Sequence, residues 1–335
     1  MIEPCKARCY PTQVNDLLIG LVSALVATNQ PAAVSNLIER TTGVRVEVTD
    51  PNDPAEKEYL KLLADDDAAH LEVDKWIKEN AKFELQGVGI PEAVLSLRIK
   101  HRFEPVGKAY EDFLQRNPKH VRARIAYGSF LGELNDEAAA AAQWEKALEL
   151  DPNNAATCNN LANYYGHNGP VEKAFDLYEK AIALNPKEAV YYHNFGTTVF
   201  LFRKHVRMHY QLTEKEVFDK AMDLYAKALK LDPNNFPLAT DVAKTYYGIE
   251  PKRTQDAKDA WNHALKLAAD DIEREGVYLH LARWEIYSGQ WDSARDYLGK
   301  VTNAMYLTTK TNVAKTLERK KEVAATNAVP TVLKP

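Results

Sequence analysis

The chain has 335 residues, of which 45% are hydrophobic and 27% are charged, and its formal net charge is −4. This composition is typical of a folded protein and excludes an intrinsically disordered one. The small acidic surplus argues against a general nucleic-acid binder, which usually carries a basic surface. The three cysteines are too few for a disulfide framework and form no CxxC pair, so neither a disulfide-rich fold nor a zinc site is expected.

Residues 1–28 contain an apolar run from Leu17 to Ala27 that has the length of a signal-peptide core. Lys6 precedes the run, as in a basic leader, but Asp16 adjoins it. Two alternatives remain open: a signal peptide of an exported or periplasmic protein, or a buried N-terminal helix of a cytoplasmic protein, which the acidic flank favours. The run is shorter than the 18 or more apolar residues that a bilayer crossing needs, so no integral membrane span is expected.

Residues 29–86 are predicted to form a helical N-terminal extension without repeats. Two helices are expected in its second half, at residues 54–65 and 67–83. The division rests on the acidic run at 65–67, because negative charge is favourable at the start of a helix. Leu71 is expected among the apolar residues that face the core.

Residues 87–301 contain an internal repeat. The prolines that close successive pairs of apolar-periodic segments are 34 residues apart: Pro118, Pro152 and Pro186. The clearest pair spans residues 155–167 and 170–184, joined by Asn-Gly-Pro, a sequence that allows positive φ and then begins a helix. A lone helical hairpin cannot bury its apolar face, so the copies are expected to stack on one another.

Small and large residues recur in register with these prolines. In the clearest copy they are Leu161, Ala162, Tyr165, Ala174, Tyr178 and Ala181. Five copies are clear, and a degenerate sixth hairpin is expected at residues 91–116, divided near Pro105. The interval from Pro186 to Pro233 is 47 residues, which is 13 longer than the period, so an insertion at about 200–216 lengthens one turn between helices.

On this register the chain resembles the tetratricopeptide repeat (TPR) family, and it is similar to uncharacterised bacterial TPR proteins with a helical N-terminal extension. The resemblance implies an all-α fold, a right-handed TPR α-solenoid of helix–turn–helix repeats. Residues 302–327 are polar and lysine-rich, as expected of a helix that caps the last hairpin, and residues 328–335 are expected to form a flexible tail.

In the family, the first helix of each hairpin lines a concave groove that holds a segment of a partner. The resemblance therefore implies a non-catalytic protein-interaction scaffold whose partner is a protein or peptide. The residues expected to face the groove lie off the packing stripe: Asn159, Asn160, Asn163, His167, His193, Asn194, Thr197, Asp241, Lys244 and Tyr247. Asparagine amides donate and accept, which suits a peptide backbone. The alternative is that these residues are solvated polar positions. The carboxylate clamp of some family members is absent, since Ile125 and Ser129 occupy two of its positions.

The insertion contains a basic, aromatic segment at residues 200–210 that holds no acid. Its possible secondary contact residues are Arg203, Lys204, His205, Arg207 and His209. Such a segment suits an acidic ligand, a phosphate or a partner. The other interpretation is a longer hairpin whose aromatic residues extend the core while the cations face water. Two histidines four residues apart lack a third ligand, so no metal site is predicted.

No nucleophile-elbow, metalloprotease, Walker or Rossmann pattern is present, and Cys158 occupies a packing position. The sequence therefore predicts that the protein is not an enzyme and needs no cofactor. One alternative function is a structural or oligomerising module that uses the 200–210 insertion and the N-terminal helix. An enzyme subunit is a further alternative. The identity of the partner and the oligomeric state stay open.

Overall fold

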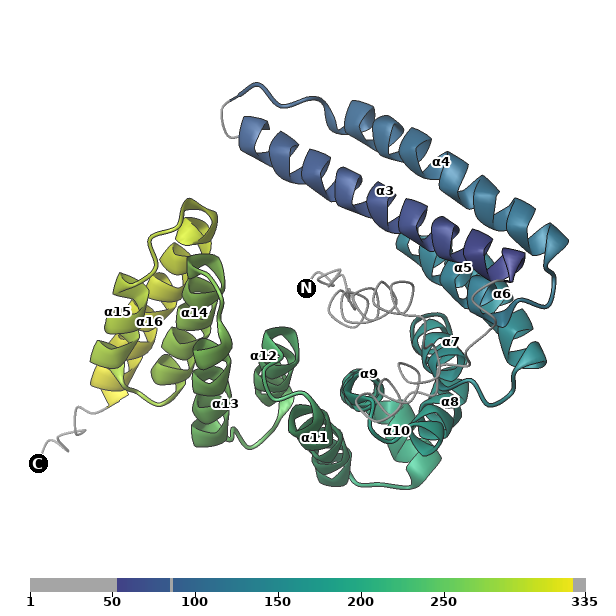
Figure 1. Ribbon diagram of the computed structural model, residues 1–335. Coiled ribbons are helices and arrows are strands. Elements are labelled where there is room, and N and C mark those ends of the chain that lie inside the picture. Colours follow the sequence, from purple (N-terminus) through teal and green to yellow (C-terminus); the bar gives the residue numbers. More distant parts are fainter. Residues whose placement is uncertain (1–52, 85–86, 328–335) are drawn as a thin grey trace, which may run out of the picture. The chain divides into compact units, whose positions relative to one another are not determined.

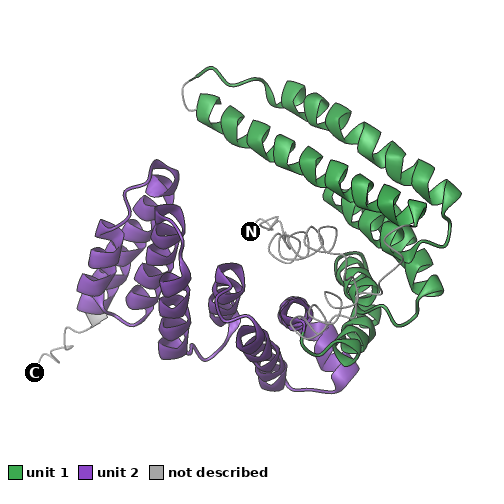
Figure 2. Cartoon of the chain, in the orientation of Figure 1, with its two compact units in different colours: residues 1–187 green, residues 188–335 purple. Residues whose placement is uncertain are grey.

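The computed structural model describes residues 53–84 and 87–327. These residues form fourteen α-helices, α3 to α16, two short 3-10 helices and no strand (Figure 1). Among them, no helix has both the length and the apolar character that a membrane crossing requires. The predictions for residues 1–28, including the apolar run from Leu17 to Ala27, and for the tail at 328–335 lie outside the described residues. The chain divides into two compact units, Met1–Lys187 and Glu188–Pro335 (Figure 2).

Unit 1 is a succession of helices in which each packs against the next along the chain. The helices are α3 (Pro54–Glu84), α4 (Glu92–Arg116), α5 (Val121–Glu133), α6 (Glu137–Leu150), α7 (Ala155–Asn168) and α8 (Val171–Leu184). The turns follow local signals. His120, Asp136 and Asn154 cap the starts of α5, α6 and α7 by accepting a backbone N–H. Gly169 ends α7 at φ 70°, a conformation that glycine adopts without strain.

Unit 2 continues with helix pairs and adds one helix inside the first pair. Its elements are α9 (Ala189–Leu201), α10 (Arg203–Tyr210), α11 (Glu214–Leu231), α12 (Phe236–Thr245), η1 (Tyr246–Gly248), α13 (Thr254–Leu267), α14 (Asp271–Tyr287), α15 (Trp291–Gly299), η2 (Ala304–Tyr306) and α16 (Leu307–Asn327). Thr213 and Glu216 form a reciprocal capping box at the start of α11, which fixes where the insertion ends. Val313 and Leu317 of α16 are buried in one cluster with residues of α14 and α15.

The five predicted repeats are five helical hairpins. They are α5–α6, α7–α8, α9–α11, α12–α13 and α14–α15, and the two helices of each pair pack together. The second helix of every pair has a fully buried alanine at the same position of the repeat: Ala140, Ala174, Ala221, Ala257 and Ala294. A side chain of this size lets two helices approach closely while larger residues fill the space on either side. Between α9 and α11, in the segment expected to hold the 13-residue insertion, the chain forms the additional helix α10.

The predicted division of the N-terminal extension at residues 65–67 is wrong, because α3 is one continuous helix. The acidic run does not start a helix. Asp66 instead accepts a hydrogen bond from the hydroxyl of Tyr110 on α4 at 2.7 Å. Leu71 was expected to face the core, but it is 71% exposed, and Ala69 and Val73 are the buried residues at this level of α3.

The predicted sixth hairpin at residues 91–116 is also wrong, because these residues form the single helix α4 with Pro105 inside it. Phe103 and Val106 are buried on either side of the proline, followed by Tyr110 and Phe113 at helical spacing. That apolar stripe packs against α3, so α4 pairs with the helix before it (Figure 1). The burial of this stripe outweighs the hydrogen bond that the proline cannot make.

Candidate partner-binding surface

In unit 1, the predicted groove residues lie on α7, the first helix of its hairpin. The Oδ1 of Asn163 accepts a hydrogen bond from the hydroxyl of Tyr178 on α8, which fixes this amide in place. Asn160 is partly exposed and His167 is exposed. Asn159 is only 6% exposed, so the expectation that it lies off the packing stripe is wrong. Its amide nitrogen donates a long hydrogen bond of 3.5 Å to the Oδ1 of Asn160.

In unit 2, three predicted residues form a linked polar group across two hairpins. The Nε2 of His193 on α9 lies 3.0 Å from the Oδ2 of Asp241 on α12, and the Nζ of Lys244 lies 3.0 Å from the Oδ1. Burial would raise the pKa of Asp241, but the hydrogen bond from His193 and the charge of Lys244 lower it. The carboxylate therefore stays ionised while its side chain is 33% exposed, and the side chain of Lys244 is 53% exposed.

Two other predicted residues repeat the arrangement seen on α7. The Oγ1 of Thr197 lies 3.1 Å from the hydroxyl of Tyr225 on α11, at the positions that Asn163 and Tyr178 occupy in the preceding hairpin. Asn194, one helical turn before Thr197, is partly exposed on the same helix. These two hairpins thus use a tyrosine hydroxyl of the second helix to orient a polar side chain of the first helix.

Tyr247, the last predicted residue, rests on α14. Its hydroxyl lies 3.1 Å from the Nδ1 of His280, and its ring stacks on Trp284 with centroids 4.9 Å apart. His280 also stacks on Trp261 with centroids 4.0 Å apart and planes 6° apart. Burial, together with the charges of Arg283 and Lys244, lowers the pKa of His280 to about 3. The imidazole is therefore neutral, and its Nδ1 can accept a hydrogen bond from the hydroxyl of Tyr247.

The sequence prediction missed His280 and Arg283, although a signal for both is present. Asn160, Asn194 and Asp241 each directly precede the large–small packing pair of their helix, and His280 directly precedes Leu281 and Ala282 in α14. Arg283 has the position of Lys244, three residues further on. Continuing the register into the last hairpin would have included both residues.

The predicted secondary contact residues lie on or beside α10. Lys204, His205, Arg207 and His209 are exposed, whereas Arg203 is partly buried. Aromatic residues of this region do extend the core, since Phe218 is buried and Phe200 packs beside it. Among the residues that the structure describes, no group of three histidine, cysteine or acidic side chains is placed to hold a metal ion. Cys158 is fully buried in α7, and burial raises the pKa of its thiol.

Two family models described as tetratricopeptide repeat match residues 121–154 and 154–185, which are the first two hairpins. An uncharacterised protein of Haemophilus influenzae is 36% identical over 77 residues, 23% of this chain and 43% of that protein. The peroxisomal targeting signal receptor of Komagataella phaffii is 35% identical over 81 residues, 24% of this chain and 14% of the receptor. The chain therefore spans less than half of the length of these relatives.

Among solved structures, the crystal structure of PilW, described as a widely conserved type IV pilus biogenesis factor, covers 67% of this chain and 95% of its own. Its TM-score is 0.51 at 14% sequence identity, so the likeness concerns the fold alone. The repeat register, the five hairpins and the two family models agree. Residues 121–185 therefore contain two tetratricopeptide repeats, and the described part of the chain has an all-α fold of successive helical hairpins.

Proposed function

We propose that this protein is a non-catalytic scaffold that holds an extended segment of a partner protein against the first helices of its hairpins. A role in protein interaction follows from the repeats, which bind proteins or peptides. We assign the contact with the partner segment to one face of the first helices within each unit. The residues are Asn160, Asn163 and His167 in unit 1, and His193, Asn194, Thr197, Asp241, Lys244 and Tyr247 in unit 2.

The observation that supports this assignment best is the linked group of His193, Asp241 and Lys244. Each oxygen of Asp241 has one intramolecular partner, and a carboxylate oxygen can accept a further hydrogen bond. The ammonium of Lys244 uses one of its three donors on that carboxylate. Asp241 therefore retains acceptor capacity for a peptide N–H, and Lys244 retains donors for a peptide C=O. Since both groups are already oriented by their partners, little side-chain entropy is lost on binding.

The same logic extends to the amides of unit 1. Asn163 is oriented by Tyr178, and its NH₂ group is left to donate. Asn160, one turn earlier on α7, presents a second amide. An amide that donates and accepts at once matches the alternating groups of a peptide backbone, so recognition of this kind depends on backbone conformation more than on sequence.

The test uses peptides selected from a random phage-displayed library on the full chain, with affinities measured by fluorescence anisotropy. Lys244→Ala and Asn160→Ala test unit 2 and unit 1 separately, and Lys230→Ala, at an exposed position on the second helix α11, is the matched control. We expect Lys244→Ala or Asn160→Ala to weaken the binding of the selected peptides by about tenfold, which corresponds to the net contribution of about one hydrogen bond. Selected peptides that bind all three variants as tightly as the unmodified chain would rule out this surface.

A further inference from the structure

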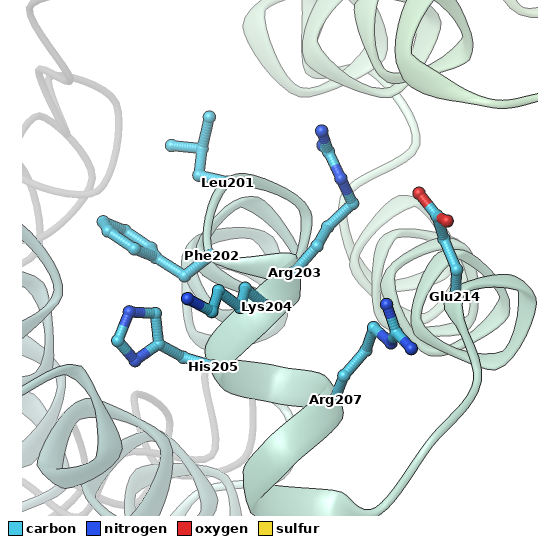
Figure 3. Close-up of a pocket in the computed structure, with 7 residues that line it drawn as sticks. All are labelled: Leu201, Phe202, Arg203, Lys204, His205, Arg207 and Glu214. Atoms are coloured by element: carbon cyan, nitrogen blue, oxygen red, sulfur yellow. The ribbon is translucent and has the colours of Figure 1, made fainter.

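A second feature of unit 2 lies away from the linked polar group, in the pocket beside α10. It is lined by Leu201, Phe202, Arg203, Lys204, His205, Arg207 and Glu214 (Figure 3). Its volume of about 350 Å³ falls at the small end of the range for ligand pockets. We propose that this pocket is a separate binding site for an acidic segment of a protein partner, in which a carboxylate side chain is accompanied by an apolar one.

The first argument is charge. Arg203, Lys204 and Arg207 fall within one helix that contains no acid, and Glu214 is the one acidic residue that lines the pocket. Within the described part of the chain, neither Lys204 nor Arg207 forms an ion pair. Like charges three or four residues apart in a helix destabilise it. The net charge of the chain is −4, so this local concentration of positive charge does not follow from the overall composition. It is complementary to an acidic ligand.

The next two acids along α11 after Glu214 have other roles. Asp219 of α11 lies 2.6 Å from the Nζ of Lys215, and Glu216 accepts hydrogen bonds from the backbone N–H and the hydroxyl of Thr213 in the capping box. Neither carboxylate can turn toward α10 without giving up these contacts. Glu214 is thus the one acid of α11 that lines the pocket, against the three fixed positive charges of Arg203, Lys204 and Arg207.

The second argument is preorganisation. The Nη1 of Arg203 donates to the carbonyl oxygen of Phe200 at 2.8 Å, and its guanidinium lies over the rings of Phe200 and Phe218 at 5.0 and 5.4 Å. A guanidinium held in this way keeps donors for a carboxylate and loses little entropy when it binds one. Figure 3 shows Arg203 and Arg207 directed toward the side of the pocket that Glu214 borders.

The third argument is the apolar wall. Leu201 is 56% exposed, and Phe202, next to it in the chain, also lines the pocket. In Figure 3 these two side chains lie on the opposite side of the pocket from Glu214. An inorganic anion would engage the cations and leave this wall uncovered, whereas an acidic peptide with an apolar residue beside its carboxylate would cover both. The two kinds of wall thus favour a protein segment over a bare phosphate.

The experiment measures fluorescence anisotropy of a labelled peptide in which Glu and Leu alternate between Gly-Ser flanks. A matched peptide has Gln in place of every Glu. We expect the Glu peptide to bind the full chain, the Gln peptide to bind at least tenfold more weakly, and binding of the Glu peptide to fall as salt rises. The double variant Lys204→Glu and Arg207→Glu should weaken the Glu peptide at least tenfold. The control pair Lys315→Glu and Arg319→Glu, on exposed positions of α16, makes the same change in net charge and should leave it unchanged.

A third variant, Phe202→Ser, tests the apolar wall separately from the charge. It should weaken the Glu-Leu peptide severalfold and leave binding of a Glu-Ser peptide unchanged. Circular dichroism of each variant shows whether the helices are retained.

Equal binding of the Glu-Leu peptide to the α10 and α16 charge variants would overturn the proposal. The proposal would also be overturned if millimolar pyrophosphate displaced the bound peptide and Phe202→Ser did not weaken the Glu-Leu peptide. That pair of results would identify the site as one for a phosphate group. The surface on the first helices is not altered by these variants, so failure here is distinguishable from failure of the proposed function.

Discussion

The Nε2 of His120 lies 3.1 Å from the Oε1 of Glu56, and this contact ties α3 to the first repeat helix, α5. The Nδ1 of His120 accepts the backbone N–H of Ala123, so the ring proton is on Nε2 and faces the carboxylate. The other oxygen of Glu56 accepts from the Nη1 of Arg122 at 2.8 Å. Glu56 is buried, and α5 therefore supplies both hydrogen-bond partners of a carboxylate that α3 removes from water.

We expect Glu56→Ala to lower the free energy of unfolding of unit 1 by about 2–3 kcal/mol. The substitution removes a buried carboxylate and leaves His120 and Arg122 without their acceptor. Urea denaturation followed by circular dichroism measures the change. Glu58→Ala is the control. Glu58 lies on the exposed side of α3 and pairs with Arg116 of α4, and exposed ion pairs contribute about 0–1 kcal/mol to stability. Equal losses in the two variants would show that the buried carboxylate has no special role in holding α3 to the repeats.

The spacing of Gly128 and Trp144 leads to a second prediction. A Cβ atom at Gly128 would overlap the indole of Trp144, whose Nε1 donates to the carbonyl oxygen of Ile125 at 3.2 Å. We expect Gly128→Ala to destabilise the α5–α6 hairpin by about 1–3 kcal/mol, because the indole must move from its place on α5. The measurement is the midpoint of urea unfolding.

Gly132→Ala is the matched control in the same helix. A Cβ there would lie 3.6 Å from the nearest atom of Trp144, which is an ordinary contact. Alanine also has a higher helix propensity than glycine, so this variant should be neutral or more stable by up to about 1 kcal/mol. If Gly128→Ala were as well tolerated as Gly132→Ala, close approach of the two helices would not be the reason for glycine at position 128.

How much could be predicted from the sequence depends on the range of the interactions. The five hairpins were predictable because each depends on short-range signals such as Asn154 and Gly169 and on a regular packing stripe. The single helices α3 and α4 were not, because Asp66 and Pro105 are local signals for a helix boundary. The contacts that outweigh them, such as the hydrogen bond between Asp66 and Tyr110, join residues that are 44 positions apart.

The candidate surface divides in the same way. The face of each first helix could be located from the repeat register, and Asn163, Thr197 and Tyr247 do lie beside polar or aromatic partners. The partners themselves could not be predicted, since they depend on how two helices cross. Burial of Asn159 was unexpected for a related reason, since it depends on which residues pack against that side of α7.

Pro105 gives a third prediction. It is exposed and lies in the interior of α4, where it cannot donate a hydrogen bond to the preceding turn. Since α4 is continuous through this position, Pro105→Ala should raise the free energy of unfolding of unit 1 by about 1–3 kcal/mol. Pro91→Ala is the control, because Pro91 is the N-cap of the same helix, where no helical hydrogen bond is lost, and it should change stability by less than about 0.5 kcal/mol. A loss of stability in Pro105→Ala would mean that the packing of α3 on α4 requires a bend at the proline.

The partly buried His280 predicts how the stability of unit 2 depends on pH. Burial lowers its pKa to about 3, whereas the unfolded chain has the ordinary value near 6.5. Between these two values the unfolded state binds a proton that the folded state does not, so stability falls as the pH falls below about 6.5. At pH 5 the loss relative to neutral pH is about 2 kcal/mol. Hydrogen exchange of peptides from α13 and α14 measures it, and His280→Gln should remove most of the pH dependence there. An unchanged dependence in that variant would contradict the assignment to His280.

The opposite dependence is expected in unit 1, where the Nε2 of His70 lies 3.2 Å from the Oδ1 of Asp66 and 3.1 Å from the Oε2 of Glu133. Burial would lower the pKa of His70, but the hydrogen bond to Asp66 and the charges of Glu133, Asp66 and Asp74 raise it overall. When it is protonated, the imidazole pairs with carboxylates on both helices and joins α3 to the last residue of α5. This contribution is complete below the ordinary pKa of histidine and is lost as the pH rises through the raised value.

We therefore expect hydrogen exchange in α3 and α5 to speed up between pH 6 and pH 8 beyond the intrinsic effect of pH, while α13 and α14 show no such loss of protection. His70→Gln should make the opening free energy of α3 equal at the two pH values, because glutamine cannot take up the proton. Glu133→Gln should reduce the same difference without abolishing it, since Asp66 remains beside the ring. A pH dependence in α3 that survives His70→Gln would assign it to another group and exclude the imidazole as the link between the extension and the repeats.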